Sequence, residues 1–515
     1  MTPPSMSRRR ALRLGGLAAL PAIAAPTALT GCGTAAGTAG DGTLRVAQPS
    51  DPTTLDPHKQ GDMFSMNVLI NIFDALTTRD AHGRLAARLA TSWEPRSRTV
   101  WRFRLREGVR FHNGEEFDAD AVKFSIERIL DPKTRSPIVE LRYVTSVRVV
   151  DRHTVDVHTT LHDPILPAKL SLFGGVIVPP KYLADVGDAA FARRPVGTGP
   201  FTFESFRRDR ELRLRANRRH FHGSPGADRL VFRALPNPAS ALAALQSDEV
   251  DLVTGLTPDA ARQLSGYAGV ELENHQGVRT AYLNLDTTSG PLRDRRVRQA
   301  LNHAIDVPLL IKAVLDGKAR EVPAMLPHGV VGFDRSIEPF RRSVRTARRL
   351  LAEAGHPHGL TTTLTASNDD AQVAEAISGL LDRAGIRARV ELLDPGTFSA
   401  RLTSDNRHAL GPVYLAASTV WTLDGASMVQ SNVRHDRRQS RWVSKEADRL
   451  VDAEELSMDP EDRQRAFTAL QRLIKREAPF VPLYQQDIIL ARTTRVRWTP
   501  VANGSLAMES AEVRT

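Results

Sequence analysis

The chain has 515 residues, 41% of them hydrophobic and 25% charged, and its formal net charge is +11. This length exceeds what one hydrophobic core usually holds, so two or more lobes are expected. Cys32 is the only cysteine, which excludes an intrachain disulfide. The arginines are scattered and no base-stacking aromatic cluster accompanies them, which argues against nucleic acid as a partner.

The first 31 residues have the pattern of an export signal. A basic segment with arginines at positions 8, 9, 10 and 13 precedes an apolar stretch from Leu14 to Leu29, which is too short and too broken by proline for a membrane span. Leu29-Thr30-Gly31-Cys32 resembles a bacterial lipobox, so cleavage before Cys32 and lipidation of Cys32 are expected; the alternative is a chance cysteine. Residues 7–12 resemble a twin-arginine signal, except that Ala11 stands where a large apolar residue is usual, so the general secretory route stays open.

Residues 32–42 predict a flexible tether, because after Cys32 they are only Gly, Thr, Ala and Asp. Cleavage leaves a chain with net charge +7. We therefore expect an extracytoplasmic monomer, lipid-anchored to the cell membrane, with the anionic membrane surface as its electrostatic neighbour. No later segment is apolar enough to cross a bilayer.

The first half of the remaining chain reads mainly as strands. Thr43–Ala47 predicts a short strand, and residues 99–106 alternate apolar and arginine side chains as a half-buried antiparallel strand does. Asp118 is placed to cap a helix whose buried stripe is Val122, Ile126, Ile129 and Leu130. Further strands are predicted at residues 154–158 and 174–178, the second ending at Pro179.

The second half alternates helices and strands, which favours an α/β fold. Apolar residues at helical spacing predict helices over residues 293–305, 346–354 and 373–384, and a strand is expected at 386–392. Asp459 and Pro460 open a last long helix, and a strand follows from Pro479 to Leu490.

Motifs that carry catalysis are missing from the sequence. Gly317-Lys318 lacks the other residues of a phosphate-binding loop, Gly197-Thr198-Gly199 has no third glycine at the required spacing, and neither a serine-nucleophile elbow nor a zinc-protease motif occurs. The pairs His220/His222 and His356/His358 are read as surface residues, with weak metal binding as the alternative. We expect no catalytic residue, no cofactor and no metal; a lipid-anchored surface hydrolase remains the alternative from another class.

The chain resembles the extracytoplasmic solute-binding proteins of the peptide/nickel class, the dipeptide and oligopeptide receptors of ABC importers. Seven blocks carry the resemblance in chain order: Leu55–His58, Asn71–Leu76, Leu89–Leu130, Pro195–Phe201, Leu283–Asp306, Ala347–Pro357 and Pro479–Tyr484. The resemblance implies a two-lobed α/β receptor of the periplasmic-binding-protein type, with a hinge and a subdomain inserted in lobe I. Lobe I would comprise residues 43–50, 195–279 and 479–515, the insert 51–194 and lobe II 280–478, with the chain crossing between lobes near 277–284 and 478–484.

The same resemblance indicates where a ligand would bind. In this family a segment of lobe II that contains tryptophan and acids lines the pocket, and its counterpart here implies ligand contacts by Ser418, Thr419, Trp421 and Asp424. Gly425 and Ala426 replace the usual proline and second acid. Asp424 would pair with a peptide's amino terminus, or else serve as a turn residue; Trp421 would stack on the ligand, or else fill lobe II. The implied function is capture of a small solute, above all a peptide, and delivery to the membrane permease of an ABC importer. A metal chelate, haem, an opine or an oligosaccharide stays open as the ligand.

Overall fold

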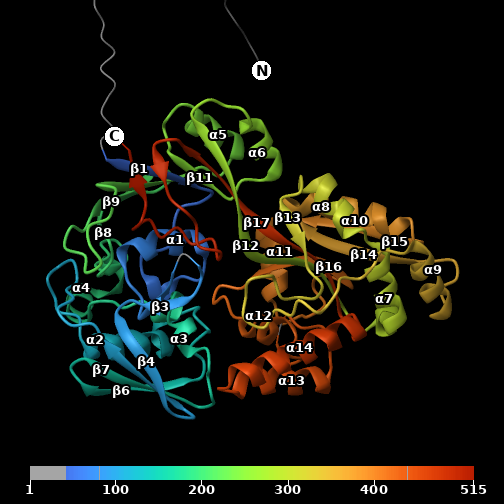
Figure 1. Cartoon of the computed structure of the whole chain (residues 1–515), viewed down its shortest axis with the longest axis horizontal. Coiled ribbons are helices and arrows are strands. Elements are labelled where there is room, and N and C mark those ends of the chain that lie inside the picture. Colours follow the sequence, from blue (N-terminus) through green and yellow to red (C-terminus); the bar gives the residue numbers. More distant parts are fainter. Residues whose placement is uncertain (1–41, 81, 438, 515) are drawn as a thin grey trace, which may run out of the picture. The chain divides into compact units, whose positions relative to one another are not determined.

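The computed structural model describes residues 42–80, 82–437 and 439–514. The predicted signal peptide, most of the tether and Cys32 lie outside the described residues. The described chain has the mixed α/β architecture that the sequence predicts (Figure 1). Among the described residues, no helix combines the length and the apolar character that a membrane span requires.

A mixed sheet of eleven strands, counted over the described residues, forms the framework. Its order is β15-β14-β16-β12-β17-β11-β1-β10-β9-β8, and β13 pairs with β17 beside this path. The strands are β1 Thr43–Gln48, β8 Phe201–Arg207, β9 Glu211–Ala216, β10 Arg229–Ala234, β11 Leu252–Thr254, β12 Val270–Leu285, β13 Ala319–Glu321, β14 Leu360–Ser367, β15 Ile386–Leu393, β16 Val413–Thr419 and β17 Phe480–Thr493.

Two long antiparallel strands, β12 and β17, join the two ends of this sheet. Their pairing runs from Val270 opposite Thr493 to Asn284 opposite Phe480, and the register shifts between Gln276 and Arg279. One end of the pair adjoins β11, which the sequence assigns to lobe I, and the other adjoins β16, which the sequence assigns to lobe II. The β12–β17 ribbon therefore connects the segments predicted as lobe I and lobe II, and its bulge lies where the first predicted crossing begins.

Helices cover lobe II on both faces of the sheet. Leu283, Leu364 and Val413 share one apolar cluster with α7, α8, α9 and α10, whereas Tyr282 and Tyr414 on the other face pack with α12, α13 and α14. The helices of this lobe are α7 Arg295–Ala304, α8 Val307–Val314, α9 Val344–Glu353, α10 Ala371–Asp382, α11 Pro395–Thr403, α12 Ala426–Asn432, α13 Lys445–Leu456 and α14 Pro460–Glu477.

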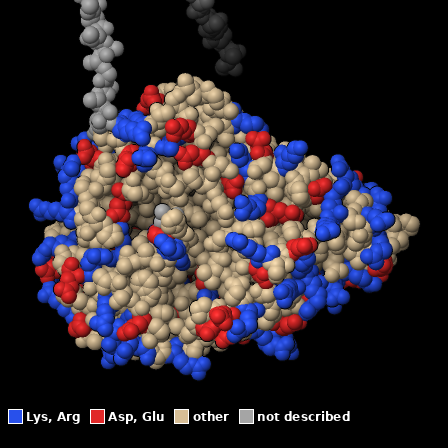
Figure 2. Space-filling view, in the orientation of Figure 1, with Lys and Arg blue, Asp and Glu red and all other residues tan. Residues whose placement is uncertain are grey.

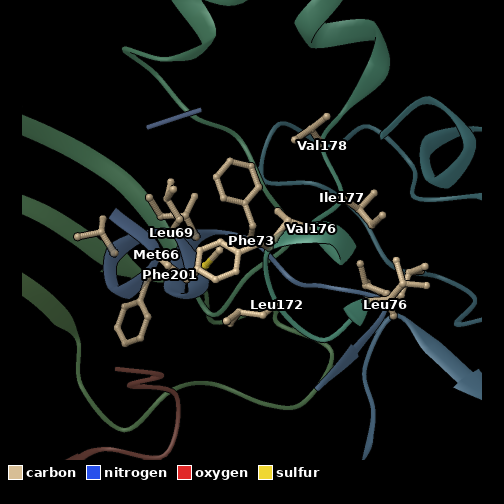
Figure 3. Packing of buried hydrophobic residues seen from close by; sticks show 14 of the residues in the cluster. Met66, Leu69, Phe73, Leu76, Leu172, Val176, Ile177, Val178 and Phe201 are labelled. Atoms are coloured by element: carbon tan, nitrogen blue, oxygen red, sulfur yellow. The ribbon is translucent and has the colours of Figure 1, made fainter. Parts of the chain in front are cut away.

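Lobe I carries α5 Pro238–Gln246 and α6 Pro258–Leu264 on one face of its sheet. On the other face, Leu44, Leu214 and Phe232 pack with residues of the segment between β1 and β8. Figure 3 shows part of this core, where Phe73 lies between Met66 and Leu69 on one side and Val176 on the other.

The segment between β1 and β8 folds around a sheet of its own, in the order β4-β5-β7-β6. Its elements are α1 Met63–Ile72, β2 Thr77–Arg79, β3 Leu85–Ala87, β4 Ala90–Ser97, β5 Val100–Leu105, α2 Ala119–Leu130, β6 Val144–Asp151, β7 Thr154–Thr159, α3 Leu166–Lys169 and α4 Pro180–Phe191. After β17 the chain adds a small hairpin of β18 Val496–Arg497 and β19 Glu512–Val513.

Most predicted elements are confirmed, and one is wrong. Trp101, Phe103 and Leu105 of β5 are buried, and the Asp118 carboxylate accepts hydrogen bonds from the second and third backbone N–H groups of α2, those of Asp120 and Ala121. The strand predicted at residues 174–178 is wrong, because Phe173–Gly175 form a 3₁₀ turn and only Val176 makes an isolated bridge, to Ala75. A Cβ on Gly175 would lie 1.9 Å from the Leu170 carbonyl oxygen, so the chain turns too tightly there for a strand.

Candidate functional site

The carboxyl ends of the parallel strands in both lobes converge on the middle of the β12–β17 ribbon. In lobe I, β11 ends at Thr254, opposite Leu490 of β17. In lobe II, β16 ends at Thr419, opposite Arg279 of β12, and Arg279 in turn pairs with Gln486 of β17. The two carboxyl edges thus point toward each other along β17. In open α/β sheets such edges are where ligands bind, so the space between them is the candidate site.

The lobe II edge presents hydroxyl groups. Ser418 and Thr419, which the sequence predicts as site residues, end β16 half-buried, and the Ser418 hydroxyl lies 3.0 Å from that of Tyr282. Ser367 ends the neighbouring β14, and its buried hydroxyl has no hydrogen-bond partner among the described residues. A polar ligand at this edge would meet donors and acceptors that the fold itself leaves available.

Two charged side chains at this edge were not predicted as site residues from the sequence. Arg279 is exposed directly after the β12 bulge, and no carboxylate of the described chain lies within ion-pair distance of it. Asp370 precedes α10 at the end of β14, where burial raises the pKa of its carboxyl against the opposing effect of the Arg279 charge. Neither residue belongs to a recognisable motif, and only the register of β12 and β14 brings them to the same edge.

The lobe I edge carries a buried amide. Gln48 ends β1, and its Nε2 donates to the carbonyl oxygens of Ser50, at 2.9 Å, and Phe64, at 3.2 Å. Its Oε1 is buried without a partner among the described residues. A cavity of about 40 Å³ lies beside it, bordered by Thr254 and Gly255 of the next strand end.

Residues that follow β16 contact the segment inserted between β1 and β8. The ring of Trp421 meets that of Phe173 edge to face, with centroids 6.4 Å apart. An Arg79 N–H donates to the Thr422 carbonyl oxygen. Farther along, Arg142 Nη2 donates to Gln430 Oε1 at 2.8 Å and lies 3.5 Å from Glu455 Oε1. Trp421 therefore lies at a contact between lobe II and the insert, beside the candidate site.

The Asp424 carboxylate forms an ion pair with the guanidinium of Arg463. Its Oδ2 and Oδ1 accept from Nη1 and Nη2 of Arg463 on α14, at 2.9 and 2.8 Å, and Oδ1 also accepts from the Ala426 backbone N–H. Glu454 joins the group, 3.2 Å from Arg463, and burial raises its pKa to about 8. The sequence did not reveal Arg463 as the partner of Asp424. Contact between Asp424 and a ligand amine stays a prediction, and such an amine would have to compete with Arg463.

The histidine pairs occupy two different environments. His220 is buried, so its prediction as a surface residue is wrong. Its ring nitrogens lie 3.5 Å from Asp74 of the insert and 3.3 Å from Glu509 of lobe I, in an ion-pair network that joins the two. His358 is exposed and His356 half-buried in the turn after α9. Over the described residues, no three histidine, cysteine or acidic side chains are grouped in a way that could hold a metal ion.

Comparison with known proteins agrees with this architecture. Residues 84–438 match the model of bacterial extracellular solute-binding proteins, family 5. The glutathione-binding protein GsiB of Escherichia coli K12 is 26% identical over 468 residues, which cover 87% of this chain and 90% of GsiB.

Two solved structures are similar to this chain in fold as well as in sequence. The periplasmic binding protein DppA of Helicobacter pylori, solved with the peptide STSA, superposes with a TM-score of 0.80 at 24% identity, covering 92% of this chain and 98% of DppA. The binding protein MoaA of Agrobacterium tumefaciens R10, solved with mannopinic acid, gives a TM-score of 0.77 at 26% identity and covers 92% of this chain and 99% of MoaA. With a family match over more than half of its length and a two-lobed α/β fold, the chain belongs to family 5 of the bacterial extracellular solute-binding proteins.

Proposed function

We propose that this extracytoplasmic protein captures a peptide between the carboxyl edges of its two lobes and delivers it to the membrane permease of an ABC importer. The observation that carries the proposal is the convergence of both edges on the β12–β17 bulge, where Arg279 and Asp370 lie. The names of GsiB and of the DppA complex, which refer to glutathione and to the peptide STSA, support a peptide as the ligand class.

The charges at the lobe II edge suit a ligand with both an amino and a carboxylate group. Arg279 offers a guanidinium fork that matches a carboxylate, and Asp370 can accept from an ammonium group. The hydroxyl groups of Ser367, Ser418 and Thr419 would complete the polar contacts. In this proposal the protein holds its ligand without chemical change, and the lobes keep the predicted bounds of 43–50, 195–279 and 479–515 for lobe I, 51–194 for the insert and 280–478 for lobe II.

Calorimetry with the purified protein tests the ligand class. The panel contains di- to tetrapeptides, glutathione and mannopinic acid, because a relative that binds the last of these is as similar as the glutathione binder. We expect saturable binding of a peptide and its recovery intact. If only mannopinic acid binds, the ligand class is an opine and not a peptide. Cleavage of the peptide would favour the hydrolase alternative.

A variant tests the role of Arg279. Arg279→Gln removes the cation, so the affinity for a peptide with a free carboxylate should fall about ten- to a hundredfold. The same peptide with an amidated carboxyl end should bind the parent weakly and lose nothing further in the variant. Arg387→Gln, which removes another exposed arginine from lobe II, is the matched control and should bind as the parent does. Equal losses for both peptides would remove Arg279 from the ligand site.

Anchoring by lipid on Cys32 is part of the proposal. Cys32→Ala should release the protein from the membrane fraction or block its maturation, and fractionation like that of the parent would contradict the anchor. Arg8→Lys with Arg9→Lys should block export if the twin-arginine route is used. Light scattering of the purified protein tests the proposed monomeric state.

A further inference from the structure

One stretch of lobe I concentrates the positive charge of the protein. Residues 193–233 contain eleven arginines and four acidic residues, a net charge of +7, which equals that of the whole chain from Cys32 onward. By comparison, residues 338–391 in lobe II contain eight arginines and seven acidic residues. Residues 193–233 therefore carry a larger net positive charge than this stretch of lobe II, which has a net charge of +1.

Most of these arginines lie on strands and turns at the β8 end of the sheet. In Figure 2 basic side chains project along the left edge, where Figure 1 places β8 and β9. Seven of the eleven are exposed and have no carboxylate within 4.0 Å among the described residues. The seven are Arg193, Arg194, Arg207, Arg208, Arg210, Arg215 and Arg219. We call this surface the basic face.

The register of the sheet places like charges next to each other. Arg215 of β9 is paired directly with Arg229 of β10, and both are exposed. Like charges directly opposite each other on antiparallel strands destabilise a sheet. Among the described residues, the only carboxylate that pairs with Arg229 is that of Glu204, at 4.0 Å. An anionic partner that covers this pair would relieve the repulsion.

The first described residues of the chain lie at the same place. Thr43, the first residue of β1, is paired with Arg229, and the Gly42 carbonyl oxygen accepts from the Asp228 backbone N–H at 2.8 Å. A hollow of about 620 Å³ extends from Thr43 across β10 and β9. At the rim of the neighbouring groove, Phe203 and Phe206 of β8 are half-buried, and the Arg208 guanidinium lies 5.7 Å from the Phe206 ring.

We propose that the basic face docks on the headgroups of anionic phospholipids at the membrane surface. Charge complementarity supports the partner, since exposed arginines near a membrane are drawn to anionic lipids. The choice of lipid over an acidic protein segment rests on the proposed anchor at Cys32, because Gly42, the last residue of the predicted tether, lies beside this face. The charge excess and the like-charge pair do not depend on that anchor.

Vesicle co-sedimentation tests the proposal. The full chain carrying Cys32→Ser, which cannot be lipidated, is mixed with vesicles of phosphatidylcholine alone or with about 30% phosphatidylglycerol. We expect at least tenfold tighter binding to the anionic vesicles at low salt, and loss of this difference at high salt. Replacement of Arg207, Arg208 and Arg210 by glutamine should reduce the binding to anionic vesicles about tenfold or more.

The control removes the same number of arginines elsewhere. Replacement of Arg383, Arg387 and Arg389, all exposed in lobe II, should leave vesicle binding as in the parent. Equal binding to neutral and anionic vesicles, or equal losses in both triple variants, would overturn the proposal. Unchanged vesicle binding of the basic-face variant together with impaired import would assign the face to an acidic segment of the permease instead. Peptide binding by both variants, measured by calorimetry, separates this test from that of the ligand site.

Discussion

Asp424, which the sequence predicts as a ligand contact, forms an ion pair with Arg463 in the structure. Its carboxylate forms two hydrogen bonds with the buried Arg463, so Asp424→Asn would leave that guanidinium short of a counter-charge. Breaking one partner of a buried pair typically costs about 3–5 kcal/mol, and we expect the free energy of unfolding to fall by that order. Urea denaturation of the variant measures it.

The same variant tests the predicted ligand contact. A peptide with a free amino terminus and its N-acetylated form are compared on Asp424→Asn. Similar affinity changes for both would assign Asp424 to the ion pair alone. A far larger loss for the free amine, with stability unchanged, would show that Asp424 serves the ligand.

The buried Glu454 makes the stability of the protein depend on pH. Burial raises its pKa to about 8 in the folded protein, above the ordinary value of 4.5, so the folded state binds this proton more tightly than the unfolded chain does. The contribution of Glu454 to the free energy of unfolding is therefore largest below pH 4.5 and is lost as the pH rises from 4.5 to 8. Over this range the free energy of unfolding falls by at most about 1.4 kcal/mol per pH unit because of this group. Denaturant midpoints from pH 5 to 9 should fall less steeply in Glu454→Gln than in the parent. Parallel curves would contradict the shift.

At the scale of elements, the bulge in β12 is fixed by one buried amide. Gln485 of β17 donates from Nε2 to the carbonyl oxygens of Gly277 and His328, and its Oε1 accepts from the His328 backbone N–H at 2.8 Å. Gln485→Met keeps the volume but leaves these groups unpaired, so we expect a loss of about 2–3 kcal/mol in stability. Gln486→Met, at the exposed neighbour, should change little; equal effects would mean that the amide does not hold the bulge.

The sequence predicted elements well wherever their pattern was local. The alternation of β5, the stripe of α10 and the caps at Asp118 and Asp459 depend on nearby residues, and the structure has all of them. The tight turn at Gly175 depends on the approach of Leu170, which no periodicity reports.

The candidate site was predicted only in part. Ser418 and Thr419 were found through the family resemblance, and they do lie at the carboxyl edge of lobe II. Arg279 and Asp370 are 91 positions apart in the chain and meet this edge only through the order of β12, β16 and β14 in the sheet. Likewise, Arg463 follows Asp424 by 39 positions and reaches it through the packing of α14.

At the scale of the whole molecule, we propose that the two lobes close on a solute. The β12–β17 ribbon connects the lobes, and contacts such as Phe173 with Trp421 and Arg142 with Gln430 join lobe II to the insert. A ligand held between the carboxyl edges favours the closed arrangement in proportion to its differential affinity for it.

Small-angle X-ray scattering of the purified protein, titrated with a peptide that calorimetry shows to bind, tests this claim most directly. We expect the radius of gyration to fall as the peptide saturates the protein, and Arg279→Gln to shift this fall to a higher peptide concentration. Tight peptide binding at an unchanged radius of gyration would contradict capture by closure of the two lobes.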